Sequence, residues 1–316
     1  MNERTLGTSG LSTPPLVLGG NVFGWTADRA ASFAVLDAFV AGGGRMIDTA
    51  ESYSAWVPGH RGGESEAVIG EWLKARGRRD GVLIATKVGW EIGNARGLSR
   101  ARIAEAIEGS LRRLGTDYID LYFAHKDDPD TPLEETLDAF DRLVRAGKVR
   151  ALGASNFDAP RLAHALDLSS QRQWTGYTVV QPLYNLMERA AFEGPLADIC
   201  RVRNLGVLPY FGLASGFLTG KYRSDADLQG RTRAGAVKPY LNARGFRVLD
   251  ALERVAREAG ATMAQVALAW VAAQPGVTAP IASATSAAQV EELLGAMRLE
   301  LTPAQLETLD LASRGA

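Results

Sequence analysis

Four polar residues have types that suit acid–base chemistry, and their places in the sequence suggest a shared site. Asp48, Lys87 and His125 each stand at or just after the end of a short apolar run, and Tyr53 lies five residues beyond Asp48. A phenol and an imidazole can move protons, and nearby charges can adjust their pKa values. Each residue taken singly could instead have a structural role: Asp48 as a helix cap, Tyr53 as a rim aromatic, Lys87 as a solvated charge and His125 as a hydrogen-bonded histidine. Burying all four is costly unless they pair, so we expect paired side chains at one site.

The chain must supply elements that carry these residues to one place. Short apolar runs alternate with amphipathic stretches along its length, which is typical of a parallel sheet covered on both faces. The eight strand-like runs are residues 15–18, 45–48, 82–85, 118–123, 149–153, 177–180, 206–210 and 277–281. Because the carboxyl ends of parallel barrel strands share one rim, residues that follow different runs can meet there.

The stretches between the runs carry helix signals. Residues 131–134, 262–265 and 302–305 have the capping-box pattern, a threonine with Glu or Gln three positions later, and apolar residues after Ser99 repeat at helical spacing. Strands interleaved with helices, without a linker-like break, predict one α/β domain over residues 1–316. We expect a single (β/α)8 TIM barrel with an N-terminal β-hairpin near residues 4–12 and a C-terminal helical tail. A doubly wound sheet is the alternative, although its usual G-x-G-x-x-G pattern is missing.

The composition argues against several classes of function. The 316 residues include 35 Lys plus Arg and 36 Asp plus Glu, a net charge of −1, which argues against nucleic-acid and polybasic membrane-surface partners. Cys200 is the single cysteine and the first five residues lack a signal pattern, so we expect a cytoplasmic protein. The three histidines are widely spaced and there is no C-x-x-C, so we expect no metal site. A monomer and a homo-oligomer both stay open.

Six stretches of the sequence resemble the aldo-keto reductase family. They read MIDTAESY at 46–53, IATKVG at 84–89, DYIDLYFAH at 117–125, GKVRALGASNF at 147–157, QPLYN at 181–185 and ASGFLTGKY at 214–222. The resemblance runs in the same order from about residue 4 to residue 311. It implies a barrel enzyme, an NAD(P)H-dependent oxidoreductase that reversibly reduces aldehydes or ketones to alcohols. It also implies that Asp48, Tyr53, Lys87 and His125 are the catalytic residues.

The chemistry of this reaction gives each of the four residues a part. As hydride reaches a carbonyl carbon, negative charge grows on the oxygen, and Tyr53 would donate a proton to it. A phenol with its ordinary pKa of about 10 is a weak donor at neutral pH, so we expect the Lys87 ammonium to lower the pKa of Tyr53. Asp48 would pair with Lys87, and His125 would donate a hydrogen bond to the carbonyl oxygen and orient the substrate.

The resemblance also implies a cofactor site spread over the last strands. Amide and hydroxyl side chains would hold the nicotinamide carboxamide, Tyr210 would stack on the nicotinamide ring, and glycines in the loop 211–221 would let backbone N–H groups approach a pyrophosphate. The loop sequence by itself indicates only a flexible loop, but its position after the seventh predicted strand favours a phosphate site. The expected cofactor-binding residues are Ser155, Asn156, Gln181, Tyr210, Phe211, Leu213, Ser215, Gly216, Lys221, Ser283, Thr285, Gln289 and Glu292.

One segment departs from the family pattern. Residues 281–293 contain hydroxyl side chains but no lysine or arginine, and Leu293 stands where an asparagine is common. NADP(H) is the usual cofactor of the family, yet its 2′-phosphate is best held by an arginine fork, so NAD(H) stays open. We predict an NADPH-to-NADH affinity ratio below about 100, unless Arg231 or Arg233 folds over the site and supplies the charge.

Aromatic residues close to the catalytic candidates predict the substrate site. Phe23, Trp25, Trp56 and Trp90 follow three of the predicted strands and could cover an apolar or ring-shaped small-molecule carbonyl or alcohol, although each could equally be rim packing. The second candidate function is a cofactor-binding regulatory or redox-sensing module with little turnover. Only three residues precede Arg4, so we expect no interaction tail, and this favours the enzyme.

Overall fold

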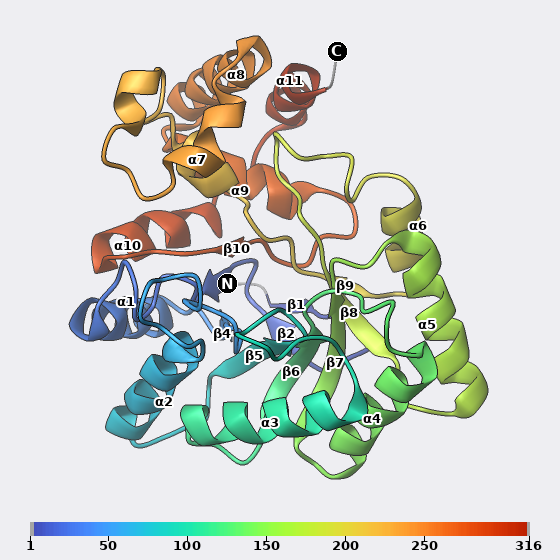
Figure 1. Cartoon of the computed structure of the whole chain (residues 1–316). Helices are drawn as coiled ribbons and strands as arrows, with labels where there is room; N and C mark the ends of the chain where they lie inside the picture. Colours follow the sequence, from blue (N-terminus) through green and yellow to red (C-terminus); the bar gives the residue numbers. More distant parts are fainter. Residues whose placement is uncertain (1–2, 315–316) are drawn as a thin grey trace.

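Eight parallel strands curl into a barrel in the computed structural model, which describes residues 3–314 (Figure 1). They pair in the order β10-β3-β4-β5-β6-β7-β8-β9. Their bounds are β3 Val17–Gly19, β4 Met46–Asp48, β5 Leu83–Val88, β6 Ile119–Ala124, β7 Val149–Ser155, β8 Tyr177–Gln181, β9 Gly206–Val207 and β10 Ile281–Ala282. All eight predicted runs contribute a strand. The ends of the predicted domain, residues 1–2 and 315–316, lie outside the described residues.

Backbone hydrogen bonds close the ring between its two ends. The amide of Thr278 donates to the carbonyl oxygen of Val207 at 2.9 Å, and the amide of Ile281 donates to that of Pro209 at 2.8 Å. These bonds join β9 and the residues after it to β10 and the segment that leads into it. The predicted (β/α)8 barrel is thus confirmed, and the open doubly wound sheet is excluded.

Alternating side chains fill the barrel and lead up to the catalytic candidates. The buried interior cluster consists of Leu6, Leu11, Val17, Met46, Leu83, Ala85, Leu121, Phe123, Ala151, Val179, Leu208, Ala279 and Ile281. Side chains two residues apart on a strand face the same way. Two residues beyond members of this cluster come Asp48, Lys87 and Gln181, and His125 directly follows β6. The strand period therefore raises these polar groups above the apolar interior, at the carboxyl end of the barrel.

An antiparallel hairpin covers the opposite end of the barrel. Strand β1 (Arg4–Thr5) pairs with β2 (Ser12–Thr13), as predicted. Between these strands, Leu6 and Leu11 belong to the apolar interior cluster. The hairpin thereby covers the amino end of the barrel, opposite the end that carries the catalytic candidates.

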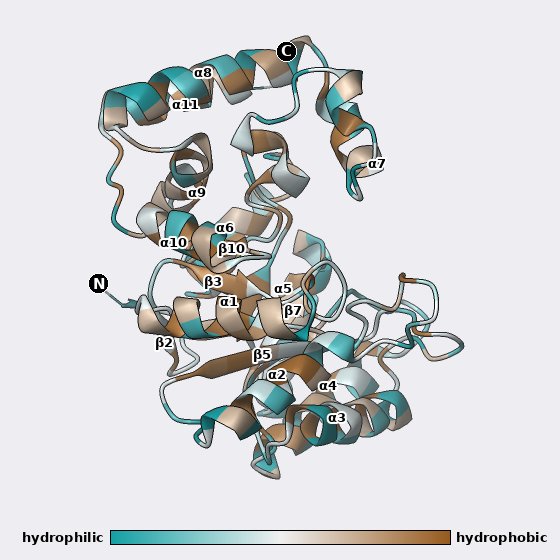
Figure 2. Ribbon diagram, turned by 90° about the vertical axis from the view of Figure 1, so that its left-hand side faces the viewer, coloured by the Kyte–Doolittle hydropathy of each residue, from teal (hydrophilic) through white to brown (hydrophobic). Residues whose placement is uncertain are grey.

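Helices surround the strands and carry the second, larger core (Figure 1). They are α1 Arg29–Ala41, α2 Glu64–Arg76, α3 Arg100–Leu114, α4 Leu133–Arg145, α5 Ala159–Arg172, α6 Pro195–Val202, η1 Ala214–Thr219, η2 Asp225–Leu228, α7 Ala234–Val237, η3 Lys238–Tyr240, α8 Ala243–Ala259, α9 Met263–Ala273, α10 Ala287–Ala296 and α11 Pro303–Ser313. Figure 2 shows helices such as α3 and α8 carrying hydrophilic residues between apolar ones. Helix α11 forms the predicted C-terminal tail. Within residues 3–314, no helix is long and apolar enough to cross a membrane.

Two of the three predicted capping boxes form. The Thr262 and Thr302 boxes begin α9 and α11 as expected. The box at Thr131 is wrong, because extended Pro132 is itself the residue before α4 and Thr131 lies one position too early. The Thr131 hydroxyl instead donates to Asp128 at 2.6 Å.

Candidate active site

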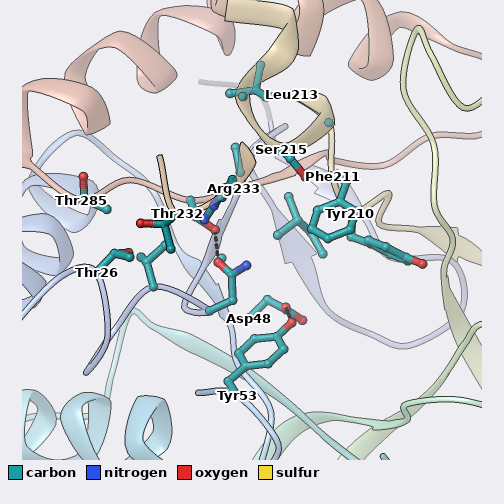
Figure 3. Close-up of a pocket in the computed structure, with 18 of the residues that line it drawn as sticks. Thr26, Asp48, Tyr53, Tyr210, Phe211, Leu213, Ser215, Thr232, Arg233 and Thr285 are labelled. Carbon is teal, nitrogen blue, oxygen red and sulfur yellow. Dashed lines mark hydrogen bonds between the residues drawn. The ribbon is translucent and has the colours of Figure 1, made fainter. Parts of the chain in front are cut away.

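Asp48, Lys87 and Tyr53 meet at the carboxyl end of the barrel. The Lys87 ammonium lies 2.7 Å from Oδ2 of Asp48 and 2.9 Å from the Tyr53 hydroxyl oxygen. The same hydroxyl donates to Oδ2 of Asp48 at 3.1 Å, and Figure 3 shows the phenol pointing at this carboxylate. Asp48 ends β4, Lys87 lies within β5 and Tyr53 comes from the loop after β4, so three chain segments build the contact.

Two further hydrogen bonds complete the pairing of this buried charge. Nε2 of Gln181 donates to Oδ1 of Asp48 at 2.9 Å, and Lys87 also donates to the carbonyl oxygen of Thr49 at 2.8 Å. Lys87 is 0% exposed and Asp48 is 1% exposed. A buried ion pair is tolerated only when such contacts satisfy both partners. Gln181, expected to bind the nicotinamide carboxamide, contacts Asp48 here.

The expected lowering of the Tyr53 pKa is wrong. Burial, and next the negative charge of Asp48, raise the pKa of Tyr53 well above its ordinary value of 10.0. Burial also lowers the pKa of Lys87, while the Asp48 charge opposes this change. Desolvation therefore outweighs the ammonium's pull on the phenol. Tyr53 keeps its proton at neutral pH.

His125 lies beside Tyr53 and Trp90 and is neutral. Its ring centroid is 5.2 Å from that of Trp90 and 6.0 Å from that of Tyr53. Burial, followed by the positive charges of Lys87 and Lys126, holds the pKa of His125 well below 6.5. A neutral imidazole carries one N–H, so it can donate only one hydrogen bond.

A cavity of about 1210 Å³ opens above these four residues and extends across the carboxyl end of the barrel (Figure 3). Asp48, Tyr53 and His125 line it, and Lys87 lies beneath. All thirteen residues expected to bind a cofactor line the same cavity: Ser155, Asn156, Gln181, Tyr210, Phe211, Leu213, Ser215, Gly216, Lys221, Ser283, Thr285, Gln289 and Glu292. The structure therefore brings the expected catalytic and cofactor residues to one place.

The four aromatic residues expected at the substrate site divide into two pairs. Trp56 and Trp90 line the cavity and are 52% and 44% exposed. Phe23 is a correction, because its ring is 0% exposed in the helix-facing core and does not line the cavity. Trp25 does not line it either, and packs edge-on against Trp56 at 5.5 Å between ring centroids. Of these four aromatic residues, Trp56 and Trp90 are therefore the ones that line the cavity.

Comparison with known families shows to which family this barrel belongs. Residues 15–314 match the model of the Aldo/keto reductase family. The chain belongs to the aldo/keto reductase family. The resemblance noted in the six sequence stretches is thereby confirmed, and the family indicates an oxidoreductase.

The names of similar proteins span enzymes and a channel subunit. The oxidoreductase YrpG of Bacillus subtilis, named as uncharacterized, is 35% identical over 319 residues, which cover 98% of this chain and 95% of that protein. The aldo-keto reductase YhdN of the same bacterium is 33% identical over 288 residues, covering 87% and 81%. A probable voltage-gated potassium channel subunit beta of Oryza sativa is 32% identical over 323 residues, covering 98% and 96%.

In this aldo/keto reductase, the loop after β9 has strained backbone where it lines the cavity. Phe211, Ala214 and Ser215 have positive φ values of 57°, 47° and 58°, and Gly216 follows with 94°. Residues with a Cβ rarely adopt such angles, and strain of this kind gathers at ligand sites. Successive turns of this type can direct backbone N–H groups toward an anion.

Arg231 and Arg233, named from the sequence as a possible source of positive charge but not counted among the expected cofactor residues, do line the cavity, together with Thr232. These residues come from the loop between η2 and α7, and Figure 3 shows Arg233 and Thr232 between Thr285 and Tyr210. Arg233 is half-buried, burial lowers its pKa, and it forms no ion pair within residues 3–314. The sequence pointed to these arginines because residues 281–293 contain no lysine or arginine that could bind a phosphate. The described part of the chain holds no group of three His, Cys, Asp or Glu suited to a metal ion.

Proposed function

We propose that this protein reversibly reduces the carbonyl group of small aldehydes or ketones to an alcohol. The observation that carries the proposal is the contact between Lys87, Asp48 and Tyr53 at the base of a cavity lined by all thirteen expected cofactor residues. Bound NAD(P)H would supply the hydride. The protein would supply the proton, the substrate orientation and a site from which water is excluded.

Tyr53 is the proposed proton donor. Its raised pKa keeps the hydroxyl protonated, and its single hydrogen points to Asp48. To reach a carbonyl oxygen, this hydrogen must turn away from Asp48 toward the cavity. When the proton leaves, the remaining phenolate lies 2.9 Å from the Lys87 ammonium, which stabilises the new charge. Lys87 thus acts on the product of the proton transfer more than on the resting phenol.

His125 is proposed to orient the carbonyl oxygen. As a neutral imidazole facing the cavity beside Tyr53, it can donate one hydrogen bond where negative charge develops. Nδ2 of Asn156 donates to the His125 carbonyl oxygen at 2.9 Å and Oδ1 of Asn156 accepts from Tyr210 at 2.7 Å. These contacts link the histidine to the proposed cofactor wall.

The cavity fits a dinucleotide together with a small substrate. Its volume of about 1210 Å³ exceeds the usual range of about 300–1,000 Å³ for a single small ligand. We propose NADP(H) as the preferred cofactor, because Arg231 and Arg233 bring to the cavity the positive charge that residues 281–293 lack. Ser283, Thr285 and Gln289 would add neutral contacts to the same end. We also propose that the described residues form one domain, since β10 pairs with β3.

Two indoles define the proposed substrate side. Trp56 follows β4 and Trp90 follows β5, and their rings flank Tyr53 and His125. Large exposed aromatics at a cavity mouth favour flat, apolar ligand groups. We therefore propose small-molecule carbonyls with an apolar or ring-shaped substituent as substrates.

A regulatory, cofactor-binding module is the second candidate, favoured by the relative named a potassium channel subunit beta. A panel of aldehydes and ketones with NADPH and with NADH separates the two. The enzyme oxidises one cofactor for each carbonyl consumed. Tight cofactor binding without turnover on any carbonyl would establish the module instead.

A further inference from the structure

The Ser52 side chain contacts His125 from the loop that carries Tyr53. It is 4% exposed, and its Oγ lies 3.4 Å from Nδ1 of the imidazole. Within residues 3–314 the Ser52 hydroxyl and this nitrogen form no other hydrogen bond. The hydroxyl of a buried serine and a partly buried ring nitrogen thus have each other as hydrogen-bond partner.

The His125 ring has little freedom to find another partner. Its backbone amide donates to Val88 at 2.8 Å, its carbonyl oxygen accepts from Asn156 at 2.9 Å, and Trp90 packs on the ring. Because the ring is neutral, either Nδ1 or Nε2 carries the proton, and the partner of one nitrogen decides which. The tautomer is then set by the direction of the bond to Ser52.

The numbers of donors and acceptors on Ser52 and His125 give the direction of this hydrogen bond. If Nδ1 carried the proton, it would donate to Oγ of Ser52 and leave the buried hydroxyl hydrogen without an acceptor among the described residues. An unmade buried hydrogen bond costs about 1–3 kcal/mol. If Ser52 donates, both groups are satisfied and the proton lies on Nε2. We propose that Ser52 is a positioning residue that holds His125 as the Nε2–H tautomer, with its single donor free for a substrate oxygen.

The proposal predicts a chemical and a kinetic consequence. Without the Ser52 hydroxyl, Nδ1 loses its donor and the two tautomers mix, so fewer molecules offer Nε2–H to the carbonyl. The loss of one neutral hydrogen bond predicts a fall in kcat/KM of about 2- to 15-fold. The kinetic part rests on the proposed carbonyl reduction, whereas the tautomer does not.

The test is long-range ¹H–¹⁵N NMR of the full-length protein labelled on histidine, without substrate. The chain has three histidines, and a His125→Asn variant identifies the signals of His125. We expect Nε2–H in the natural protein and in Ser52→Thr, and a tautomer mixture in Ser52→Ala. Ser54→Ala is the matched control, because Ser54 is also buried in this loop but donates to the Phe23 carbonyl oxygen at 3.3 Å.

The NMR and kinetic results together decide whether Ser52 holds the His125 tautomer. Nδ1–H in the natural protein overturns the proposal, and this reading needs no variant that could misfold. An unchanged Nε2–H signal in Ser52→Ala, with kcat/KM equal to that of Ser54→Ala, overturns it as well. If the tautomer depends on Ser52 but no carbonyl is turned over, the positioning role stands and the proposed function fails.

Discussion

The charged side chains on the two sides of the cavity differ in burial and in ion pairing. Beneath Tyr53, Lys87 and Asp48 are fully buried and paired with each other. Across the cavity, Lys221 and Arg231 are exposed and Arg233 is half-buried, and none of them forms an ion pair within residues 3–314. The paired side has its geometry built in before a substrate arrives, as the proposed proton transfer requires. The unpaired side leaves cations free to bind the phosphates of the proposed cofactor.

The largest effect is expected where a buried pair is broken. Lys87→Met removes the cation that lies 2.7 Å from Asp48 and leaves a buried carboxylate with Gln181 and Tyr53 as neutral partners. We expect the free energy of unfolding to fall by about 3–5 kcal/mol, measured by urea denaturation.

The double variant Asp48→Asn, Lys87→Met is the matched control for this prediction. It removes both charges, so it should recover part of the lost stability, while activity stays absent. A single Lys87→Met variant as stable as the natural protein would contradict the view that this side depends on its internal pairing.

A smaller effect on binding is expected on the unpaired side. Arg233→Ala should weaken NADPH binding by about 10- to 100-fold and NADH binding much less, because a charged hydrogen bond contributes about 1.5–3 kcal/mol. Its stability should change little. Isothermal titration with both cofactors measures this, with Arg231→Ala as a companion variant.

Arg223→Ala tests whether position, rather than charge alone, matters. Arg223 comes from the same region of the chain but pairs with Asp250 and Glu253 and does not line the cavity. We expect its cofactor affinities to equal those of the natural protein. Equal losses in both variants would point to general electrostatic attraction instead of a phosphate site.

The smallest effect is expected from pH. The pKa of Tyr53 is raised, so the protonated donor persists as pH rises, and the pKa of His125 is lowered, so its neutral form persists as pH falls. The rate constant for carbonyl reduction at saturating cofactor should stay level from pH 6.5 into mildly alkaline solution. A fall in kcat that titrates just above neutral pH would contradict this, because it would show that the phenol or the Lys87 ammonium, whose pKa burial lowers, loses its proton there.

The sequence predicted part of each side of the cavity, for different physical reasons. The ends of the apolar runs predicted the places of Asp48, Lys87 and His125, because the carboxyl ends of parallel barrel strands lie at one rim. The raised pKa of Tyr53 was not readable, since desolvation depends on the whole finished surroundings of the hydroxyl. The direction of the Phe23 ring was hidden for a similar reason, because packing against helices leaves no local pattern.

Loops gave weaker signals than strands. The loop that bears Arg231 and Arg233 has no hydrophobic period, so its sequence showed a need for charge near the cavity but not where the chain would fold. The Thr131 capping box failed by a single position, because Pro132 takes an extended conformation and precedes α4 itself. Segments without a repeating pattern are placed by tertiary contacts alone.

The division between the two sides is tested most directly by a single turnover of Tyr53→Phe saturated with NADPH. This variant removes the proposed proton donor and leaves the loops after β9 and β10 untouched. We predict that carbonyl reduction slows by at least about 100-fold while the dissociation constant for NADPH stays within about twofold. A rate close to that of the natural protein would contradict the role of Tyr53, and a matching loss of NADPH affinity would show that the two sides are not separate.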